Sequence, residues 1–260
     1  MDQPGEISLS CKNVDIAVPG RSLVQQLNLN IVANEFLAVL GPNGVGKSLS
    51  LHALAGLRAP DNGQIELDGQ QILDLSRQQI AARLALLPQY TEDVFPATVI
   101  DTVMIGRHPH IGRFQWETDR DREIAFSALK EVDLEDMTHR DINTLSGGER
   151  RRLAVAQVLT QDPAIYLLDE PTNHLDPQHQ LNVLRIFKEK ARSGAAIIAS
   201  LHDVNLAARF ADKCLLLYGD GRWILGDTDT VLTTQRLTEL YATPMESVSW
   251  RNTNLFVAAG

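Results

Sequence analysis

The stretch GPNGVGKS at residues 41–48 decides the fold of this chain. An apolar run at residues 36–40 precedes it and a segment of helical character, residues 49–57, follows it, which is the strand–loop–helix order of a phosphate-binding loop. The glycines leave room for backbone N–H groups to surround a polyphosphate, and the positive end of the following helix faces the anion. Lys47 supplies a charge for the β- and γ-phosphates, and Ser48 offers a hydroxyl to Mg²⁺. The sequence therefore predicts a nucleotide-binding site.

The composition is typical of a folded globular chain. Of the 260 residues, 44% are hydrophobic and 22% are charged, and the formal net charge is -9. Nucleic-acid binders usually present a basic face, so we expect no nucleic-acid partner. The two cysteines, Cys11 and Cys214, match no metal-ligand spacing, and we expect both to be reduced thiols of the core.

The N-terminus and the hydropathy pattern argue against direct membrane insertion. Residues 1–6 are polar and partly acidic, unlike a signal peptide. No apolar run approaches the roughly 18 residues that a membrane-spanning helix needs. We therefore expect any membrane association to come through a partner.

The first part of the chain is rich in strand signals. Apolar residues alternate in two segments, which predicts a half-exposed antiparallel sheet. Ser76 with Gln79 forms a capping box for a short helix. The predicted strands are 7–18 and 27–31 in that sheet, then 64–67, and then 83–88, which ends in Gln89.

The pattern then becomes helical, with few strand signals. A loop is expected at residues 106–114. Its two histidines, His108 and His110, allow a metal site, but histidines in a proline-containing loop are more often surface residues, and we favour that interpretation. The predicted helices are 98–105 and 118–132.

Alternating strand and helix signals return in the last hundred residues. Proline stands at the start of the predicted helix and Gly194 follows its end. The predicted elements are buried strands at 164–168 and 195–201, a helix at 177–193, a hairpin of 213–218 with 222–225, and a last strand pair of 247–250 with 255–257.

Two carboxylates, Asp169 and Glu170, follow the buried strand at residues 164–168. Ligands of doubly wound sheets bind at the carboxyl ends of strands. We therefore predict that Asp169 holds Mg²⁺ beside the phosphate loop and that Glu170 polarises the attacking water. A strand followed by a polar turn is common, so this assignment depends on the phosphate loop upstream.

The segment LSGGE at residues 145–149 precedes a helix predicted at 150–160. Its serine and glutamate satisfy a capping box, so the simplest interpretation is a helix start. However, Gly147 and Gly148 leave backbone N–H groups bare at a helix N-terminus, which favours a second anion site. Two anion sites in a chain with one nucleotide suggest that a partner chain uses the second.

These motifs, together with NHLD at residues 173–176 and with His202, resemble the nucleotide-binding subunits of ABC transporters. They occur in the order and approximate spacing of that family and span nearly the whole chain. The resemblance implies an α/β fold: a P-loop NTPase core with an N-terminal antiparallel β subdomain and an inserted α-helical subdomain. The implied single ABC ATPase domain covers 1–260, with 1–89 and 162–260 as the α/β core and about 90–161 as the helical subdomain.

The resemblance also implies roles for single residues. Gln89 would contact Mg²⁺ and the attacking water, Asp176 would cross a dimer interface, and His202 would touch the γ-phosphate. A satisfied core histidine is the alternative for His202. The expected catalytic residues are Glu170, His202 and Gln89, and the expected metal ligands are Ser48, Gln89 and Asp169. The expected contacts to ATP are Gly41, Pro42, Asn43, Gly44, Val45, Gly46, Lys47, Ser48, Leu49, Ser146, Gly147, Gly148 and Asp176.

By the same resemblance the chain hydrolyses ATP with Mg²⁺ and drives import. It would form a head-to-tail dimer with ATP held between the phosphate loop of one chain and residues 145–149 of the other. Two integral membrane permease subunits would be its partners, and a periplasmic or surface binding protein would act indirectly. We expect a peripheral subunit on the cytoplasmic face of the inner membrane.

Short segments bear on the cargo. TV at 98–99, GRHPH at 106–110, QHQ at 178–180 and LYATPM at 240–245 look like segments of importer ATPases for haem, iron–siderophores and vitamin B12. We predict haem as the transported substrate, with an iron–siderophore or vitamin B12 as the alternatives. A soluble, non-transport ABC ATPase and a nucleotide-binding regulator without turnover are the alternative functions, and Glu170 argues against the second.

One residue departs from the family pattern. Members usually place an aromatic residue near the N-terminus to stack on adenine, whereas the matching residue here is Val18. Arg21 offers an alternative, because its guanidinium can lie over the base.

Overall fold

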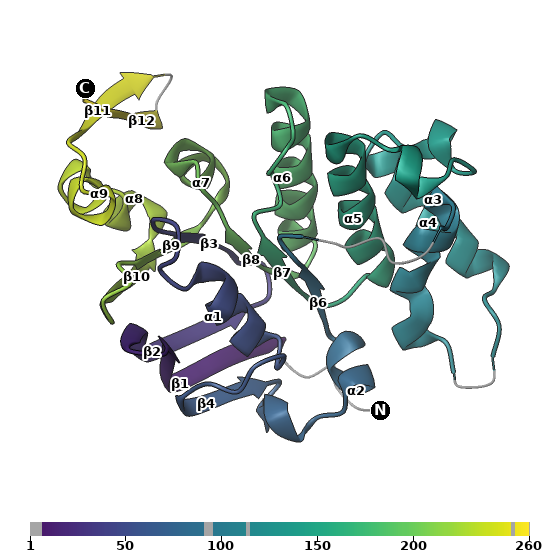
Figure 1. Ribbon diagram of the computed structural model, residues 1–260, viewed down its shortest axis with the longest axis horizontal. Helices are drawn as coiled ribbons and strands as arrows, with labels where there is room; N and C mark the ends of the chain where they lie inside the picture. Colours follow the sequence, from purple (N-terminus) through teal and green to yellow (C-terminus); the bar gives the residue numbers. More distant parts are fainter. Residues whose placement is uncertain (1–6, 91–95, 113–114, 251–252, 260) are drawn as a thin grey trace.

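The computed structural model describes residues 7–90, 96–112, 115–250 and 253–259 (Figure 1). A six-stranded sheet runs through the molecule in the order β10-β9-β3-β8-β7-β6. Five of these strands pair in parallel, and β10 joins β9 as an antiparallel edge. The strands are β3 (Phe36–Leu40), β6 (Leu84–Leu87), β7 (Ile165–Asp169), β8 (Ala196–Ser200), β9 (Lys213–Leu217) and β10 (Trp223–Asp227).

The central strands are apolar because both faces of the sheet are covered. All five residues of β3 are buried, and they alternate between two cores. Leu37 and Val39 face a core shared with the N-terminal sheet and the first helix. Phe36, Ala38 and Leu40 face a second core, shared with the helices on the other side. The sheet thus separates two apolar layers.

The N-terminal sheet is antiparallel and has the order β2-β1-β4-β5. Its alternating buried residues, such as Leu9, Ile31 and Ile65, pack on the core below, so the predicted half-exposed sheet is confirmed. The two-residue strand β5 has no periodicity of its own and was not predicted. The strands are β1 (Ser8–Val18), β2 (Arg21–Val32), β4 (Asn62–Leu67) and β5 (Gln70–Gln71).

Helices cover the remaining faces of the core (Figure 1). Helix α1 (Lys47–Leu54) lies between the two sheets, where Leu51 and Leu54 are buried. The predicted capping box of Ser76 and Gln79 opens α2. The other core helices are α2 (Arg77–Ala81), α6 (Pro177–Arg192), α7 (Val204–Phe210), α8 (Thr228–Val231) and α9 (Thr234–Tyr241).

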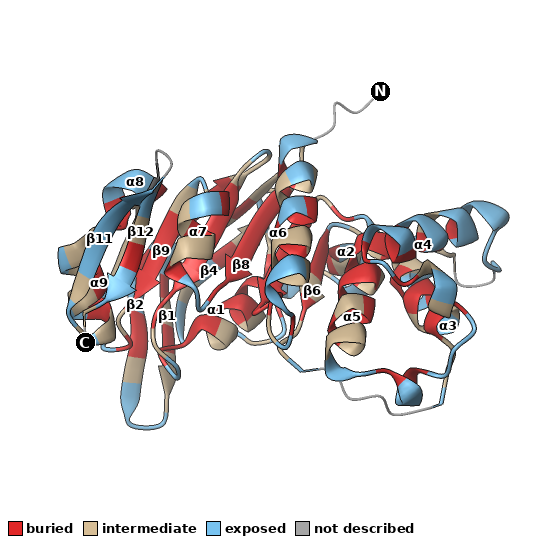
Figure 2. Cartoon of the chain, turned by 90° about the horizontal axis from the view of Figure 1, so that it is seen from above, coloured by how far each residue is buried: buried red, intermediate tan, exposed pale blue. Residues whose placement is uncertain are grey.

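Between β6 and β7 the described residues contain helices and no strand, and Figures 1 and 2 place these helices at one end of the molecule. Capping boxes open all three α-helices, at Thr98, Thr118 and Ser146. The boundaries of a helical subdomain at about 90–161 stay a prediction. The helices are α3 (Val99–Met104), α4 (Asp119–Glu131) and α5 (Gly147–Gln161).

The loop expected at 106–114 was partly wrong. A 3-10 helix, η2 (Ile105–His110), continues directly from α3. Its contacts to the end of α5 explain this: Arg107 Nη1 donates to Thr160 O at 3.0 Å, and His110 Nε2 lies 2.7 Å from Gln161 O. Among the described residues, no group of His, Cys, Asp and Glu side chains is arranged to hold a metal ion.

The C-terminal hairpin is confirmed, as β11 (Met245–Trp250) paired with β12 (Thr253–Ala258). Both cysteines are buried free thiols, as predicted. None of the helices in the described ranges has the length and apolar composition needed to cross a bilayer.

Candidate nucleotide-binding site

The loop at residues 41–46 joins the end of β3 to the start of α1, as predicted. Gly46 caps the helix with a φ of 107°, in the left-handed region that favours glycine. A Cβ atom on Gly41 would lie 2.4 Å from Leu217 O of β9, so no side chain fits there. Gly41 thus lets the backbone lie close to β9, and Gly46 lets it turn into the helix beside Leu23.

Lys47 is the first residue of α1, and its side chain reaches back to this loop. Its Nζ donates to Gly41 O at 2.8 Å and to Pro42 O at 3.1 Å. Burial lowers the pKa of Lys47, while the negative charges of Glu170 and Asp169 oppose that shift. The ammonium and the two carboxylates therefore belong to one electrostatic site, as an ATP-binding loop beside a magnesium ligand requires.

Asp169 ends β7 and is 1% exposed. Its Oδ1 accepts a hydrogen bond from Ser200 Oγ at 2.6 Å, and Ser200 Oγ also accepts from Glu170 N at 2.9 Å. Asp169 Oδ2 is buried and has no hydrogen-bond partner among the described residues. Leaving a charged oxygen without a partner is costly, and a cation would supply one. The donor set therefore fits Mg²⁺.

Side chains from three segments contact the carboxylate of Glu170. Its Oε2 accepts from Gln89 Nε2 at 2.8 Å and from Asn173 Nδ2, and its Oε1 lies 2.5 Å from His202 Nε2. Glu170 itself is 6% exposed and has a left-handed φ of 50°. The structure thus brings together the three predicted catalytic residues, and their roles stay predictions.

No role was predicted for Ser200 or Asn173. The available signal for Ser200 was a polar residue ending a buried strand, and it pairs with Asp169 in the parallel register of β7 and β8. The signal for Asn173 was its place three residues after Glu170, on the turn that brings its amide back to that carboxylate.

The second predicted anion site is the N-terminus of α5. Ser146 and Gly147 are exposed, and a Cβ atom on Gly147 would meet no atom within 4 Å. A Cβ atom on Gly148 would lie 3.3 Å from His174 O. Among the described residues, no hydrogen bond joins these residues to the loop at 41–46, and the sharing of one ATP between two chains stays a prediction.

Asp176 has a local role that the sequence did not indicate. It caps α6, with Oδ1 accepting from His179 N at 3.0 Å and Oδ2 lying 2.8 Å from His179 Nδ1. These bonds lower the pKa of Asp176. The side chain is exposed, which leaves the predicted interface contact possible.

The region of the missing aromatic residue contains Arg21. Its Nε donates to Gly219 O at 2.9 Å. A Cβ atom on Gly219 would lie 2.8 Å from Arg21 Nη2 and 2.9 Å from Val45 Cγ1, so the guanidinium lies beside the phosphate-binding loop. Val18 is half-buried and packs against the N-terminal core.

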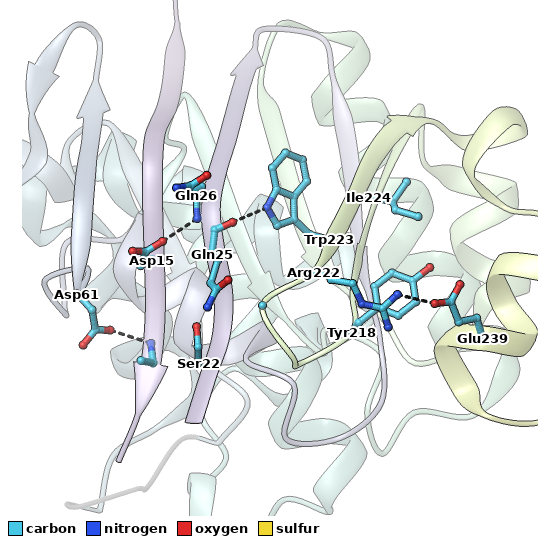
Figure 3. A pocket seen from close by; sticks show the side chains of 12 residues that line it. Asp15, Ser22, Gln25, Gln26, Asp61, Tyr218, Arg222, Trp223, Ile224 and Glu239 are labelled. Atoms are coloured by element: carbon cyan, nitrogen blue, oxygen red, sulfur yellow. Dashed lines mark hydrogen bonds and ion pairs between the residues drawn. The ribbon is translucent and has the colours of Figure 1, made fainter. Parts of the chain in front are cut away.

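A hollow of about 750 Å³ lies next to this region, between the N-terminal sheet and the turn from β9 to β10 (Figure 3). Its polar groups bond to each other: Asp15 accepts from Gln26 N, and Arg222 donates to Glu239. None of the predicted site residues lines it.

The sequence profile of a family described as ABC transporter matches residues 24–173, more than half of the chain. The chain belongs to the ABC transporter family. The predicted family, the α/β fold class and the ATPase activity are thereby confirmed.

Relatives of known description lie within the same family. The hemin import ATP-binding protein HmuV of Nocardia farcinica is 39% identical over 247 residues, which are 93% of this chain and 85% of that protein. A solved ABC transporter described as of the metal-chelate type, in an inward-facing conformation, matches with a TM-score of 0.83 and 30% identity over 98% of both chains. The dimeric structure of the bacterial ABC transporter cassette MJ0796 matches with a TM-score of 0.74 and 26% identity, over 85% of this chain and 98% of that one.

Proposed function

We propose that this ABC ATPase is the energising subunit of an importer for haem, with an iron–siderophore or vitamin B12 as the alternative cargo. The observation that carries the hydrolytic part is Glu170, whose carboxylate is held by Gln89, Asn173 and His202 next to Asp169. The cargo part rests on the hemin import relative and on the metal-chelate type transporter.

For hydrolysis, Glu170 is the general base. It takes a proton from a water molecule whose oxygen attacks the γ-phosphorus, while the bond from that phosphorus to the bridging oxygen of ADP breaks. Gln89 and His202 hold the carboxylate from two sides, which fixes where its lone pairs point. The side chain of His202 is 43% exposed, and it would also contact the γ-phosphate.

The phosphates and Mg²⁺ are bound by separate groups. Lys47 exchanges its bonds to Gly41 O and Pro42 O for phosphate oxygens. Ser48, Asp169 Oδ2 and Gln89 would hold Mg²⁺, which when bound neutralises charge on the β- and γ-phosphates. Leu49 follows on the first turn of α1, where the helix N-terminus faces the anion.

The active form is a head-to-tail dimer. Exposed Ser146 and Gly147 of one chain cover the γ-phosphate of the ATP held by the other chain, and Asp176 crosses the interface. The dimeric structure of the related cassette MJ0796 supports a dimer.

The dimer would bind two permease subunits at the cytoplasmic face of the inner membrane, and a substrate-binding protein would act through them. By the family resemblance, the segment from about Gln89 to Arg113 would meet the permease, and its residues 91–95 lie outside the described residues. We expect substitutions there to reduce transport more than basal ATP hydrolysis.

The test is co-purification of the chain with its permease, followed by ATPase measurements in proteoliposomes with candidate binding proteins. Stimulation by a haem-loaded binding protein, but not by siderophore- or cobalamin-loaded ones, supports the proposal. Stimulation by another chelate alone would replace the cargo. Absence of ATP hydrolysis by the complex would overturn the energising role itself.

A further inference from the structure

Arg151 lies in the first turns of α5 and is 5% exposed. Its guanidinium donates to four backbone carbonyl oxygens and to no carboxylate among the described residues. Nη1 donates to Pro88 O at 2.7 Å and Gln89 O at 3.4 Å, and Nη2 donates to Asp169 O at 2.5 Å and Glu170 O at 2.8 Å.

These carbonyls belong to the two segments that carry the hydrolytic side chains. Gln89 follows β6, Glu170 follows β7, and the two strands are parallel neighbours. The side chains of Gln89 and Glu170 bond to each other, while their carbonyls bond to Arg151. The guanidinium therefore closes a ring of contacts that fixes the separation of the two segments.

The burial of this charge is expensive. Burial lowers the pKa of Arg151 to about 10, and its Nε has no hydrogen-bond partner among the described residues. A guanidinium in such a place is stable only with its carbonyl partners where they are, because moving them leaves a buried charge unpaired. The contact consequently resists any shift of α5 relative to Gln89 and Glu170.

The same helix begins with Ser146 and Gly147, the residues that the proposed dimer places on the partner's nucleotide. We propose that Arg151 is a positioning residue for hydrolysis. It ties the Gln89–Glu170 pair of one subunit to the helix by which that subunit contacts the ATP of the other. Docking of α5 on one nucleotide is thereby transmitted to the hydrolytic carboxylate beside the second nucleotide. This inference rests on the proposed ATPase dimer.

A purely structural role is the competing explanation, and Arg107 provides the matched control. Arg107 is also largely buried in the helical region, bonding Asp121 Oδ1 at 2.8 Å through Nε and Thr160 O through Nη1. Among the described residues, its hydrogen bonds and ion pair go to Asp121 and Thr160 and not to Gln89 or Glu170. Arg107→Gln therefore removes a comparable buried guanidinium without touching the ring.

The experiment compares purified wild type, Arg151→Gln, Arg151→Lys and Arg107→Gln in ATP hydrolysis and thermal unfolding. We expect both glutamine variants to lower Tm. Only Arg151→Gln should lower kcat, by about 10- to 100-fold, with KM for ATP within about threefold, because the phosphate-binding loop is unchanged. The dependence of rate on ATP concentration should also lose its cooperativity. Arg151→Lys keeps the charge but reaches fewer carbonyls, so its kcat should lie between those of the wild type and of Arg151→Gln.

A double-mutant cycle with Gln89→Ala separates positioning from general destabilisation. If Arg151 acts through the Gln89–Glu170 pair, the double variant loses much less activity than the product of the single losses. Equal kcat in wild type and in both Arg151 variants, or strictly multiplicative losses with cooperativity retained, would overturn the inference. If Arg151→Gln does not fold, Arg151→Lys carries the same comparison. A wild type without ATPase activity would instead refute the proposed function.

Discussion

The substitution Glu170→Gln separates the chemistry of the carboxylate from its packing. The carboxamide has the same size, and its oxygen can accept from Gln89 and Asn173 while its NH₂ group faces His202 Nε2. The contacts of the side chain with its three partners are therefore kept. What is lost is the ability to take a proton from water.

The expected loss follows from that difference. General base catalysis contributes about 10²- to 10⁴-fold, which is about 2.7–5.4 kcal/mol of transition-state stabilisation at about 1.36 kcal/mol per tenfold. Affinity for ATP should persist, because Lys47 and Asp169, which would bind the phosphates and Mg²⁺, are unchanged. An ATP-bound dimer should consequently accumulate.

Phosphate release gives kcat and KM, and size-exclusion chromatography with light scattering in ATP and Mg²⁺ gives the dimer fraction. Glu35→Gln is the control, since Glu35 is a half-buried carboxylate paired with Lys213, away from the site. We expect it to retain kcat within about twofold. A kcat for Glu170→Gln within threefold of the wild type would remove Glu170 from the role of base.

Three further predictions concern the ATP site shared in the dimer, the binding of adenine, and the stability of the protein at acid pH. Ser146→Arg places bulk and charge on the exposed cap of α5, so hydrolysis should collapse while filter-binding shows ATP still bound; normal hydrolysis would contradict the shared site. Arg21→Ala should raise KM for ATP a few-fold if the guanidinium contacts adenine, whereas Val18→Tyr should lower it if aliphatic contact limits affinity, and ATP should be preferred over GTP by less than about tenfold. A strong ATP preference unaffected by either change would show that other groups hold the base. Hydrogen bonds from Thr118 and Arg107 lower the pKa of Asp121 to about 2, so its stabilisation, about 1–2 kcal/mol, is present above pH 4 and lost as pH falls toward 2; Asp121→Asn should lower Tm at pH 7 and flatten that acid dependence, and an unchanged Tm at pH 7 would contradict it.

The sequence predicted those parts of the site that depend on chain neighbours. The loop at 41–46 lies between a strand and a helix, and the capping boxes at Ser76 and Ser146 are both present, because such motifs are fixed by local geometry. The strand ending in Asp169 was equally accessible, since a buried parallel strand is an unbroken apolar run.

Contacts between distant segments were not accessible in the same way. Only the family resemblance connected Gln89 with Glu170, and spacing alone does not show that β6 and β7 are neighbours in the sheet. In the sequence, Arg151 is the second of three consecutive arginines on a helix, and a run of charged residues usually indicates exposure to solvent. Its burial depends on where α5 packs, and η2 depends likewise on carbonyls at the other end of that helix.

The two apolar layers on either side of the central sheet separate two mechanical tasks. Val45 and Leu51, around the phosphate-binding loop, pack in the layer with the N-terminal sheet. The buried residues of α3, α4 and α5, such as Val103 and Leu153, pack in the layer on the opposite face. A change in the angle of the helical end would act on the second layer and, through the bonds of Arg151, on Gln89 and Glu170, whereas the packing around the phosphate-binding loop lies in the first layer. The loop can therefore keep the phosphates of the nucleotide bound while the helices change their angle.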